Sequence, residues 1–253
     1  MDKSEGLALA ISRASKVVFF TGAGISTESG LPDYRGGNGL WKTQDPNRFT
    51  LSNLLSSSEV RTELWKDPVL SGRGKHNPNA GHFAIAKLAN PKREVVVITQ
   101  NVDGLHQVAG SLTVIELHGS TNRIICRSCG REANLSKIHQ EVDSGNFDPH
   151  CLCGGPFLPA VVFFEELVGP SVWNQAEAAI KSCEVFVVAG SSLVVSPAAK
   201  LPHLAVIAGA RTAIINLGET SFDIMTDFLL PGPCGKILQQ ITARTIALDA
   251  GIK

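Results

Sequence analysis

The feature that most constrains the fold is a series of short apolar runs separated by helical patterns. The runs typical of buried strands cover residues 16–21, 94–99, 113–117, 184–189 and 212–217. Helical spacing of apolar residues covers 6–15, 80–88 and 170–181. Strands that are apolar throughout must be buried on both faces, and here helices alternate with them. The pattern therefore predicts an α/β fold with a Rossmann-like, doubly wound parallel sheet.

Two segments interrupt this alternation. Residues 32–78 are polar, rich in glycine, asparagine and serine, and only weakly helical, whereas residues 118–159 carry four of the six cysteines. We interpret both segments as insertions into the connections of the sheet. They predict a second, smaller lobe beside it.

The composition gives no overall attraction to nucleic acid or to an anionic membrane. The 23 lysines and arginines balance 23 aspartates and glutamates, so the formal net charge is zero. The longest apolar runs are too short to span a bilayer, and the first residues carry acids in place of a signal-type apolar core. We therefore expect a soluble, cytoplasmic protein. The sequence does not indicate its oligomeric state.

The first predicted strand leads directly into a glycine-rich stretch, residues 22–26 (GAGIS). Such a turn can hold the pyrophosphate of a dinucleotide, because glycines let the backbone approach the phosphates and a helix N-terminus supplies N–H donors. From this loop alone, a purely structural tight turn is an equal alternative. The next strand begins only at residue 94 and is followed by Gln100 and Asn101. That spacing argues against an ordinary hydride-transfer domain, in which a ribose-binding acid follows sooner.

Polar groups follow or end four of the predicted strands. They are Gln100, Asn101 and Asp103, then His118, then Gly190, Ser191 and Ser192, and then Asn216. Each group alone has an ordinary explanation as a turn, a helix cap or a satisfied core side chain. Carboxyl ends of parallel strands meet at one edge, however, and ligands of open α/β sheets bind there. His118 can accept a proton near neutral pH, which suits a general base acting on a ribose hydroxyl.

The clustered cysteines form two close pairs, Cys126 with Cys129 and Cys151 with Cys153. The segment between the pairs has the length common between zinc knuckles, and two thiolates from each of two turns give a tetrahedral sulfur site. Because the pairs contain no acid or histidine ligand, we expect a closed, structural zinc site. A redox dithiol or chance clustering is the alternative. The isolated cysteines at 183 and 234 are typical of buried apolar residues.

Taken in order, these motifs resemble those of the sirtuins. The matching stretches are residues 22–26 (GAGIS), 32–36 (PDYRG), 99–103 (TQNVD), 117–119 (LHG), the four paired cysteines, 190–192 (GSS) and 215–216 (IN). The resemblance extends from about residue 16 to residue 238. It implies one catalytic domain over residues 1–253, with a Rossmann-like large lobe at 1–31, 90–118 and 160–253, a helical and cofactor-loop insertion at 32–80, and a zinc module at 119–159.

The resemblance also implies an activity. Sirtuins are NAD-consuming protein-lysine deacylases, in which the acyl oxygen attacks the nicotinamide ribose, nicotinamide leaves, and free lysine and O-acyl-ADP-ribose are formed. NAD would be the co-substrate, zinc a structural ion, and acylated-lysine proteins or peptides the partners. A same-fold NAD glycohydrolase or ADP-ribosyltransferase is the alternative, because it would share the NAD pocket without needing an acyl-lysine tunnel.

The family's functional residues can be carried over to matching positions. His118 and Asn101 are the implied catalytic residues, and Ser26, Asn101 and Asp103 would line the nicotinamide pocket. The implied NAD contacts are Gly22, Ala23, Gly24, Ser26, Asp33, Tyr34, Arg35, Gln100, Asn101, Asp103, Gly190, Ser191, Ser192, Asn216 and Cys234. The residues that would flank an extended acyl-peptide, added as a strand between the lobes, are Val162, Phe163, Phe164, Leu193 and Val194.

The sequence also departs from the family's usual pattern. Leu158 replaces an arginine, and Glu165 replaces a glycine at a position where the backbone can need an unusual φ. Sirtuins that remove succinyl groups bind the acidic acyl tail with a Tyr-x-x-Arg pair, which residues 63–70 lack. A buried carboxylate requires a charge-assisted partner, and Pro68 is expected to end a helix at this point. We therefore expect neutral acyl groups to be preferred over succinyl.

Overall fold

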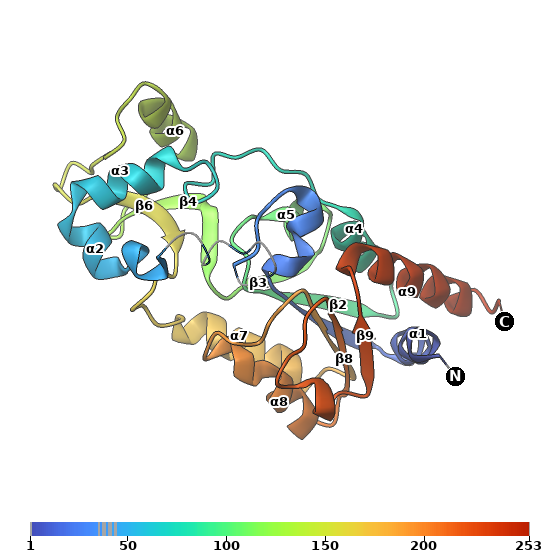
Figure 1. The fold of residues 1–253 in the computed structure, drawn as a ribbon. Helices are drawn as coiled ribbons and strands as arrows, with labels where there is room; N and C mark the ends of the chain where they lie inside the picture. Colours follow the sequence, from blue (N-terminus) through green and yellow to red (C-terminus); the bar gives the residue numbers. More distant parts are fainter. Residues whose placement is uncertain (1, 35, 37–38, 40–41, 43–44, 253) are drawn as a thin grey trace.

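The computed structural model describes residues 2–34, 36, 39, 42 and 45–252. Its largest element is a six-stranded sheet in the order β3-β2-β1-β7-β8-β9, in which every neighbouring pair is parallel (Figure 1). The strands are β1 (Lys16–Thr21), β2 (Glu94–Thr99), β3 (Thr113–Glu116), β7 (Val185–Ala189), β8 (Arg211–Asn216) and β9 (Phe228–Pro231). The strand order changes direction at β1, which is the kind of switch point where doubly wound sheets bind ligands.

Helices cover both faces of this sheet, with a separate hydrophobic cluster under each face. One face carries α1 (Lys3–Arg13), α4 (Ala80–Lys87) and α9 (Cys234–Asp249), and the other carries α7 (Pro170–Lys181) and α8 (Leu201–Ile207). Along β1, Val17 and Phe19 belong to the first cluster and Val18 and Phe20 to the second. Because alternate side chains enter opposite clusters, the whole strand is apolar. The predicted doubly wound α/β fold is confirmed.

A smaller lobe is formed by the segments that interrupt the alternation. The first contributes α2 (Leu51–Ser56) and α3 (Ser58–Lys66), and the second contributes α6 (Leu135–Asp143) and an antiparallel sheet of β5 (Glu132–Ala133), β4 (Gly119–Cys126) and β6 (Phe157–Val161). Figure 1 shows this lobe at the end of the molecule away from α1 and α9. Trp65, Ile124 and Leu158 are buried in a third hydrophobic cluster. The two insertions therefore share one core.

Side-chain caps determine where the helices of the small lobe begin. The hydroxyl of Thr50 accepts the N–H of Asn53 at the start of α2, and the hydroxyl of Ser57 accepts the N–H of Val60 at the start of α3. Helix α3 ends at Lys66, two residues before Pro68. The predicted end of a helix at Pro68 is thus confirmed, because proline cannot continue a helix.

All five predicted strands occur, with ends shifted by at most one residue, but β9, α8 and α9 of the large lobe and the individual elements of the small lobe were not predicted. Strand β9 is an apolar run of only four residues that ends in proline and lies at the edge of the described sheet beside β8, so the run is too short to distinguish a strand from a loop. The short helical turns are α5 (Leu105–Val108), η1 (Ala23–Ile25), η2 (Thr27–Ser29), η4 (Pro46–Phe49), η5 (Ala198–Lys200) and η6 (Asp223–Met225). Among the helices in the described part of the chain, none has both the length and the apolar character that crossing a bilayer requires.

Candidate functional site

The glycine-rich loop after β1 packs directly against the turn after β7. The N–H of Gly24 donates to the Gly190 carbonyl at 2.8 Å, and the N–H of Gly22 donates to the Ala189 carbonyl at 3.2 Å. A Cβ added at Gly22 or Gly24 would lie 2.8 Å from backbone atoms of Gly190. Gly190 itself has a φ of 66°, and a Cβ there would lie 2.2 Å from the Ile25 nitrogen. These glycines therefore allow two loops to approach each other closely, whatever else the loop binds.

The polar groups at the strand ends come together at the carboxyl edge of the sheet. Backbone hydrogen bonds continue past the strands, from the N–H of Gln100 to the Thr21 carbonyl at 2.9 Å and from the N–H of Gly190 to the Ile215 carbonyl at 3.0 Å. The side chain of Gln100 donates from Nε2 to Ser191 Oγ at 2.8 Å. Residues that follow β2 and β7 are therefore in direct contact, although β1 lies between the two strands.

Ser26, Asn101 and Asp103 form one hydrogen-bonded cluster at this edge. Ser26 Oγ donates to Asp103 Oδ2 at 2.7 Å and accepts from Asn101 Nδ2 at 3.0 Å. Asn101 Nδ2 also lies 3.1 Å from the Gly22 carbonyl, which connects the cluster to the glycine loop. Only 2% of the Ser26 surface is exposed. The structure thus brings together the three residues that the resemblance assigns to a nicotinamide pocket.

His82, which the sequence interpretation gave no role, contacts this cluster. It lies in the first turn of α4, where its Nδ1 accepts the N–H of Asn79 at 3.2 Å. The neutral ring therefore carries its proton on Nε2, which lies 3.5 Å from Ser26 Oγ. Burial lowers the pKa of His82 to about 4, although the charge of Asp103 opposes this shift. The available sequence signal was the spacing of Asn79 and His82, which is that of a capping box.

His106 is a second buried histidine beside the cluster. Its ring packs edge-on against that of His82, with centroids 4.8 Å apart, and its Nε2 lies 2.9 Å from Thr21 Oγ1. Burial, together with the neighbouring His82, lowers the pKa of His106 to about 3. Both histidines are therefore neutral at pH 7 and act as buried hydrogen-bonding groups.

His118 follows β3 and is held by two backbone contacts. Its Nδ1 lies 3.1 Å from the carbonyl oxygen of Gln100, and its own carbonyl accepts the N–H of Val162 at 2.8 Å. A carbonyl can only accept, so Nδ1 donates, and Nε2 of the neutral ring is the basic nitrogen. Burial lowers the pKa of His118, with the bond to Gln100 opposing the shift. The result is a neutral imidazole of fixed tautomer, which is the form a general base requires.

The residues predicted for the adenosine half of NAD lie after β7 and β8 and at the start of α9. The N–H of Gly232 donates to the Asn216 carbonyl at 2.9 Å, so the turn before α9 contacts the end of β8. Cys234 is buried and donates from Sγ to the Ile215 carbonyl at 3.4 Å. Burial, with a contribution from the charge of Glu28, raises the pKa of Cys234 to about 12, so it is a neutral thiol. The Ser192 side chain is exposed at the same edge.

The motif at residues 32–36 is described only in part. Asp33 Oδ1 accepts the N–H of Gly36 at 3.0 Å, which closes a local turn. Tyr34 is half-buried. Arg35, predicted to contact NAD, lies outside the described residues.

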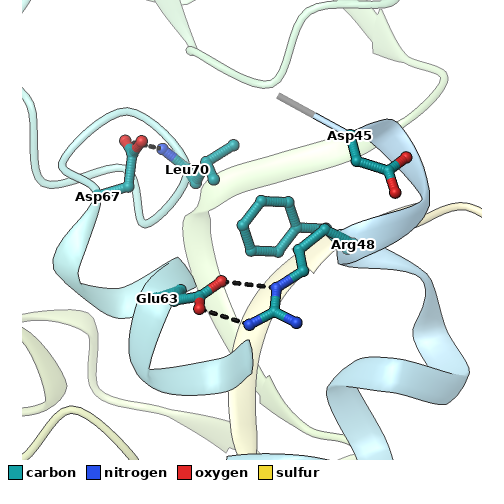
Figure 2. A pocket seen from close by; sticks show the side chains of 6 residues that line it. Asp45, Arg48, Glu63, Asp67 and Leu70 are labelled. Atoms are coloured by element: carbon teal, nitrogen blue, oxygen red, sulfur yellow. Dashed lines mark hydrogen bonds and ion pairs between the residues drawn. The ribbon is translucent and has the colours of Figure 1, made fainter. Parts of the chain in front are cut away.

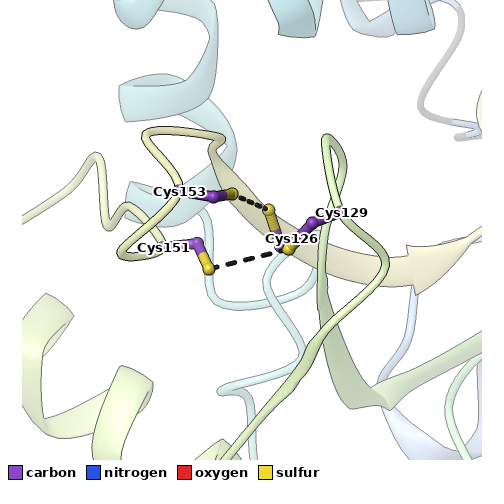
Figure 3. Close-up of side chains that lie close together, drawn as sticks. All are labelled: Cys126, Cys129, Cys151 and Cys153. Carbon is purple, nitrogen blue, oxygen red and sulfur yellow. Dashed lines mark hydrogen bonds between the residues drawn. The ribbon is translucent and has the colours of Figure 1, made fainter.

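The four paired cysteines meet in the small lobe (Figure 3). Their sulfur atoms all lie within 4.8 Å of one another, with Cys126 Sγ 3.4 Å from Cys153 Sγ and Cys129 Sγ 3.8 Å from Cys151 Sγ. A tetrahedral zinc ion with Zn–S bonds of about 2.3 Å needs sulfur–sulfur distances of about 3.8 Å. Four thiol donors at this spacing therefore fit zinc and leave no coordination position for a substrate, as in closed structural sites.

Hydrogen bonds within this cluster shift its thiol pKa values. Burial raises the pKa of Cys126, but bonds from the backbone of Cys129 and Ser128 and from neighbouring thiols outweigh it and lower the value to about 7. For Cys153, a bond from the backbone of Gly155 lowers the pKa, but the thiols of Cys126 and Cys129 raise it to about 12. Cys126 is therefore partly thiolate at neutral pH, which is the form that binds metals.

A model of the Sir2 family matches residues 22–197, which include the glycine loop, His118 and all four clustered cysteines. The chain belongs to the Sir2 family. NAD-dependent protein deacetylase 2 of Streptomyces coelicolor is 41% identical over 88% of this chain and 94% of the relative.

Solved structures of Sir2 proteins are similar to this Sir2-family protein over nearly its whole length. One, from work on the mechanism and regulation of Sir2 enzymes, has 37% identity and a TM-score of 0.88 and covers 97% of this chain and 98% of its own. Another is a Sir2 mutant with a deacetylated p53 peptide and 3′-O-acetyl ADP-ribose, with 33% identity, a TM-score of 0.84 and full coverage of both chains (100% each).

In this Sir2-family chain, the segment Val162–Phe164, here called the substrate segment, contacts the cysteine knuckle on one side. Arg127 lies between Cys126 and Cys129 and donates to the Val161 carbonyl at 2.8 Å. Its guanidinium also pairs with Glu166 at 3.0 Å and lies 4.9 Å from the centroid of the Phe163 ring. The cysteine module and the segment expected to bind peptide are therefore joined through Arg127, a partly buried arginine that sequence reasoning did not identify.

The other predicted peptide contacts lie after β7. Leu193 is 7% exposed and has a φ of 53°, whereas Val194 is 62% exposed. Phe164, in the substrate segment, is 42% exposed. Apolar side chains are thus accessible on both segments that were predicted to flank a peptide.

A cleft of about 350 Å³ lies in the small lobe of this sirtuin (Figure 2). It is lined by Asp45, Arg48, Phe49, Glu63, Asp67 and Leu70. Arg48 donates from Nε to the Glu63 carboxylate at 2.8 Å and from Nη2 to its other oxygen, so the two charges neutralise each other. The two remaining lining carboxylates disfavour an anion such as pyrophosphate.

Proposed function

We propose that this sirtuin removes acyl groups from lysine side chains of proteins in an NAD-dependent reaction. The deacetylase relative and the solved Sir2 complex with a deacetylated peptide and 3′-O-acetyl ADP-ribose support this activity. The observation that carries the proposal is the state of His118, a buried neutral imidazole whose Nδ1 is fixed by the Gln100 carbonyl. Acylated-lysine proteins or peptides would be its partners. A cytoplasmic location stays a prediction.

The nicotinamide pocket is assigned to the cluster of Ser26, Asn101 and Asp103. A primary carboxamide needs both a hydrogen-bond acceptor and a donor. The Asp103 carboxylate has lone pairs that can accept the carboxamide N–H. The Ser26 hydroxyl and the Asn101 amide N–H groups bond within the cluster, and one of them would exchange its partner to donate to the carboxamide oxygen. The chemistry of these groups fits nicotinamide. When bound, NAD supplies the ribose that takes up the acyl group and the nicotinamide that leaves.

The rest of NAD would lie along the carboxyl edge of the sheet. Ala23, Gly24 and Arg35 would contact the phosphates and ribose of NAD, and Gly22, Asp33 and Tyr34 would belong to the same cofactor-binding region. Gln100 would face the nicotinamide ribose. Ser192 and Asn216 would hold the adenosine half, with Cys234 near the adenine, and Gly190 and Ser191 would complete the cofactor-binding edge. Since Cys234 is a buried neutral thiol, it would contribute shape rather than charge.

His118 would take a proton from a ribose hydroxyl at Nε2. Its Nδ1–H would stay on the Gln100 carbonyl throughout, so the ring would not have to change tautomer before the transfer. The same carbonyl would stabilise the imidazolium that forms, because its oxygen carries partial negative charge. Burial keeps the ring neutral before the step and thus ready to act as a base.

The four cysteines would hold zinc as a structural ion. The metal would close the two knuckles against each other, and through Arg127 it would support the substrate segment. No step of the chemistry is assigned to it.

The activity is tested by incubating the purified protein with NAD, with and without an acetylated lysine peptide. We expect nicotinamide release that depends on the peptide, and mass spectrometry should detect O-acetyl-ADP-ribose beside the free peptide. Release of nicotinamide without peptide would identify an NAD glycohydrolase instead, and transfer of ADP-ribose to protein would identify a transferase. If neither NAD nor peptide is consumed, the proposal is wrong.

A further inference from the structure

Glu165 combines a side chain with a backbone conformation that side chains disfavour. Its φ is 76°, in the left-handed region where a Cβ crowds the following carbonyl oxygen. Within the described residues, only Glu165 and Leu193 are non-glycine residues with positive φ. Glu165 directly follows the substrate segment, and Leu193 lies in the other segment predicted to flank a peptide. Strain of this kind persists where surrounding contacts over-determine it, and it is often found at ligand sites.

The carboxylate of Glu165 reaches the first turn of α2. Its Oε2 accepts the N–H of Ser52 at 3.1 Å, and the neighbouring N–H of Leu51 donates to the Phe164 carbonyl at 3.0 Å. Thr50 also forms a parallel bridge with Phe164. The first N–H groups of a helix have no partner within the helix, so the segment containing Phe164 and Glu165 supplies their acceptors.

The next residue, Glu166, reaches in the other direction. It accepts the N–H of Phe163 at 2.9 Å and pairs with Arg127 of the cysteine knuckle at 3.0 Å. Two consecutive glutamates therefore hold the substrate segment from two sides, Glu165 toward α2 and Glu166 toward the knuckle. The contact of Glu166 is largely buried, whereas that of Glu165 is exposed to solvent.

Stability alone does not account for Glu165. One exposed hydrogen bond contributes little and is offset by the strain at a positive φ. A glycine would adopt the same φ without strain, but it would leave the N–H of Ser52 without this acceptor. A glycine would hold the substrate segment less firmly. Among the contacts described above, the Glu165 carboxylate is the one side chain that fastens this segment to α2.

We propose that Glu165 is a positioning residue for the acylated peptide. Its carboxylate fastens the substrate segment to the first turn of α2 and so holds in place the backbone edge on which the peptide would pair. This inference rests on the proposed deacylase function. The His118 ring is fixed by the Gln100 carbonyl, which lies outside the substrate segment, so loss of the Glu165 contact acts on peptide affinity and not on the proton transfer.

The test compares Glu165→Gly and Glu165→Gln with wild type in steady-state assays on an acetyl-lysine peptide. Glutamine keeps a carbonyl acceptor for Ser52, whereas glycine removes it. We expect Glu165→Gly to raise the peptide KM about fivefold, the scale of one lost hydrogen bond, with kcat and the KM for NAD within about twofold of wild type. Glu165→Gln should restore the peptide KM to within about twofold. Glu94→Gln, an exposed carboxylate at the amino end of β2, is the matched control.

Thermal melting separates positioning from a purely structural role. Because glycine relieves the strained φ, the Tm of Glu165→Gly should not fall. If the peptide KM of Glu165→Gly is unchanged, the positioning role is wrong. The role is also wrong if kcat falls and the KM values for peptide and NAD rise by the same factor. Both outcomes leave the deacylase assignment intact. Direct titration of a fluorescent acetyl-lysine peptide gives the same comparison without turnover. A wild-type protein that neither binds nor consumes the peptide overturns both proposals.

Discussion

The two sheets of this sirtuin are stabilised in different ways. The six-stranded parallel sheet buries a hydrophobic cluster on each face, and its polar side chains gather only where the strands end. The three-stranded sheet of the small lobe has one cluster, includes a two-residue strand, and is joined to turns that carry four cysteines. A sheet of three strands is near the lower limit for independent stability and needs a hydrophobic face or a packed helix. The comparison predicts that the small lobe gains more of its stability from a bound metal than the large lobe does.

The largest expected effect is therefore loss of the metal from the small lobe. Elemental analysis should find one zinc per chain, and Cys153→Ser should lose it together with several kcal/mol of stability, because a structural zinc site contributes directly to folding. Thermal unfolding measures the change. Cys183→Ala, a buried cysteine outside the cluster, should keep the metal. Zinc retained in Cys153→Ser would contradict the four-cysteine site.

The second effect concerns chemistry in the large lobe. His118→Ala should lower kcat/KM for an acetylated peptide by about 10²-fold, the usual scale for a lost general base, while NAD still binds and the Tm changes little. Steady-state kinetics and NAD titration measure the two quantities. His203→Ala, an exposed histidine on α8, should leave both unchanged. Near-normal turnover in His118→Ala would remove His118 from the mechanism.

A third effect is the pH dependence of stability that arises from two buried histidines of the large lobe. The folded-state pKa values of His82 and His106, about 4 and 3, lie below the usual 6.5, so the unfolded chain binds more protons between these limits. The contribution of these histidines to the free energy of unfolding is therefore fully present above about pH 6.5. It decreases as the pH falls toward 4, by up to about 1.4 kcal/mol per pH unit for each histidine. Denaturant unfolding at pH 7, 6 and 5 measures the slope.

His106→Asn gives the matched comparison for this pH dependence. Acid also protonates the cysteine thiolates, so the informative quantity is the difference in slope between this variant and wild type, both measured with zinc present. We expect the free energy of unfolding of the variant to fall less steeply below pH 6.5, because unfolding then takes up about one proton fewer than in wild type. An identical slope would show that His106 is not buried in its neutral form.

The smallest effect is the acyl preference. The two cations near the end of α3 are already engaged: Lys66 lies 5.2 Å from the Phe147 ring centroid, and Arg73 bonds Asp143 at 2.7 Å and the Trp65 carbonyl at 2.6 Å. An acidic acyl tail would have to break these contacts or remain unpaired. We expect kcat/KM for acetyl, butyryl and myristoyl forms of one peptide to exceed that for the succinyl form by about tenfold. A succinyl value above all three would show that another cation binds the tail.

The same contrast explains what the sequence could predict. A strand such as β1 is apolar along its whole length because both faces are buried, so its position is visible locally. The core of the small lobe joins Trp65, Ile124 and Leu158, which are far apart in the chain and show no common pattern. The positive φ of Glu165 could be predicted from the sequence, because the family usually has glycine at this position and glycine is typical of such backbone conformations.

Contacts between residues that are distant in the sequence could not be predicted from such local patterns. The position of His82 beside Ser26 depends on how α4 is capped, and Arg127 becomes visible as a link only once β6 lies next to the knuckle. Ligand contacts at the sheet edge and the exact lobe limits at residues 31, 80, 118 and 159 stay predictions.

The close contact between the loops at Gly22, Gly24 and Gly190 has a consequence for mutational scanning. Each added Cβ would meet backbone of the neighbouring loop, so all three positions should be intolerant of every side chain. Such intolerance is often taken as evidence of a ligand contact, yet here it would occur without any ligand. The informative positions in a scan of this edge are therefore those where a side chain fits, such as Ala23, where variants that still fold would reveal how closely a bound phosphate approaches.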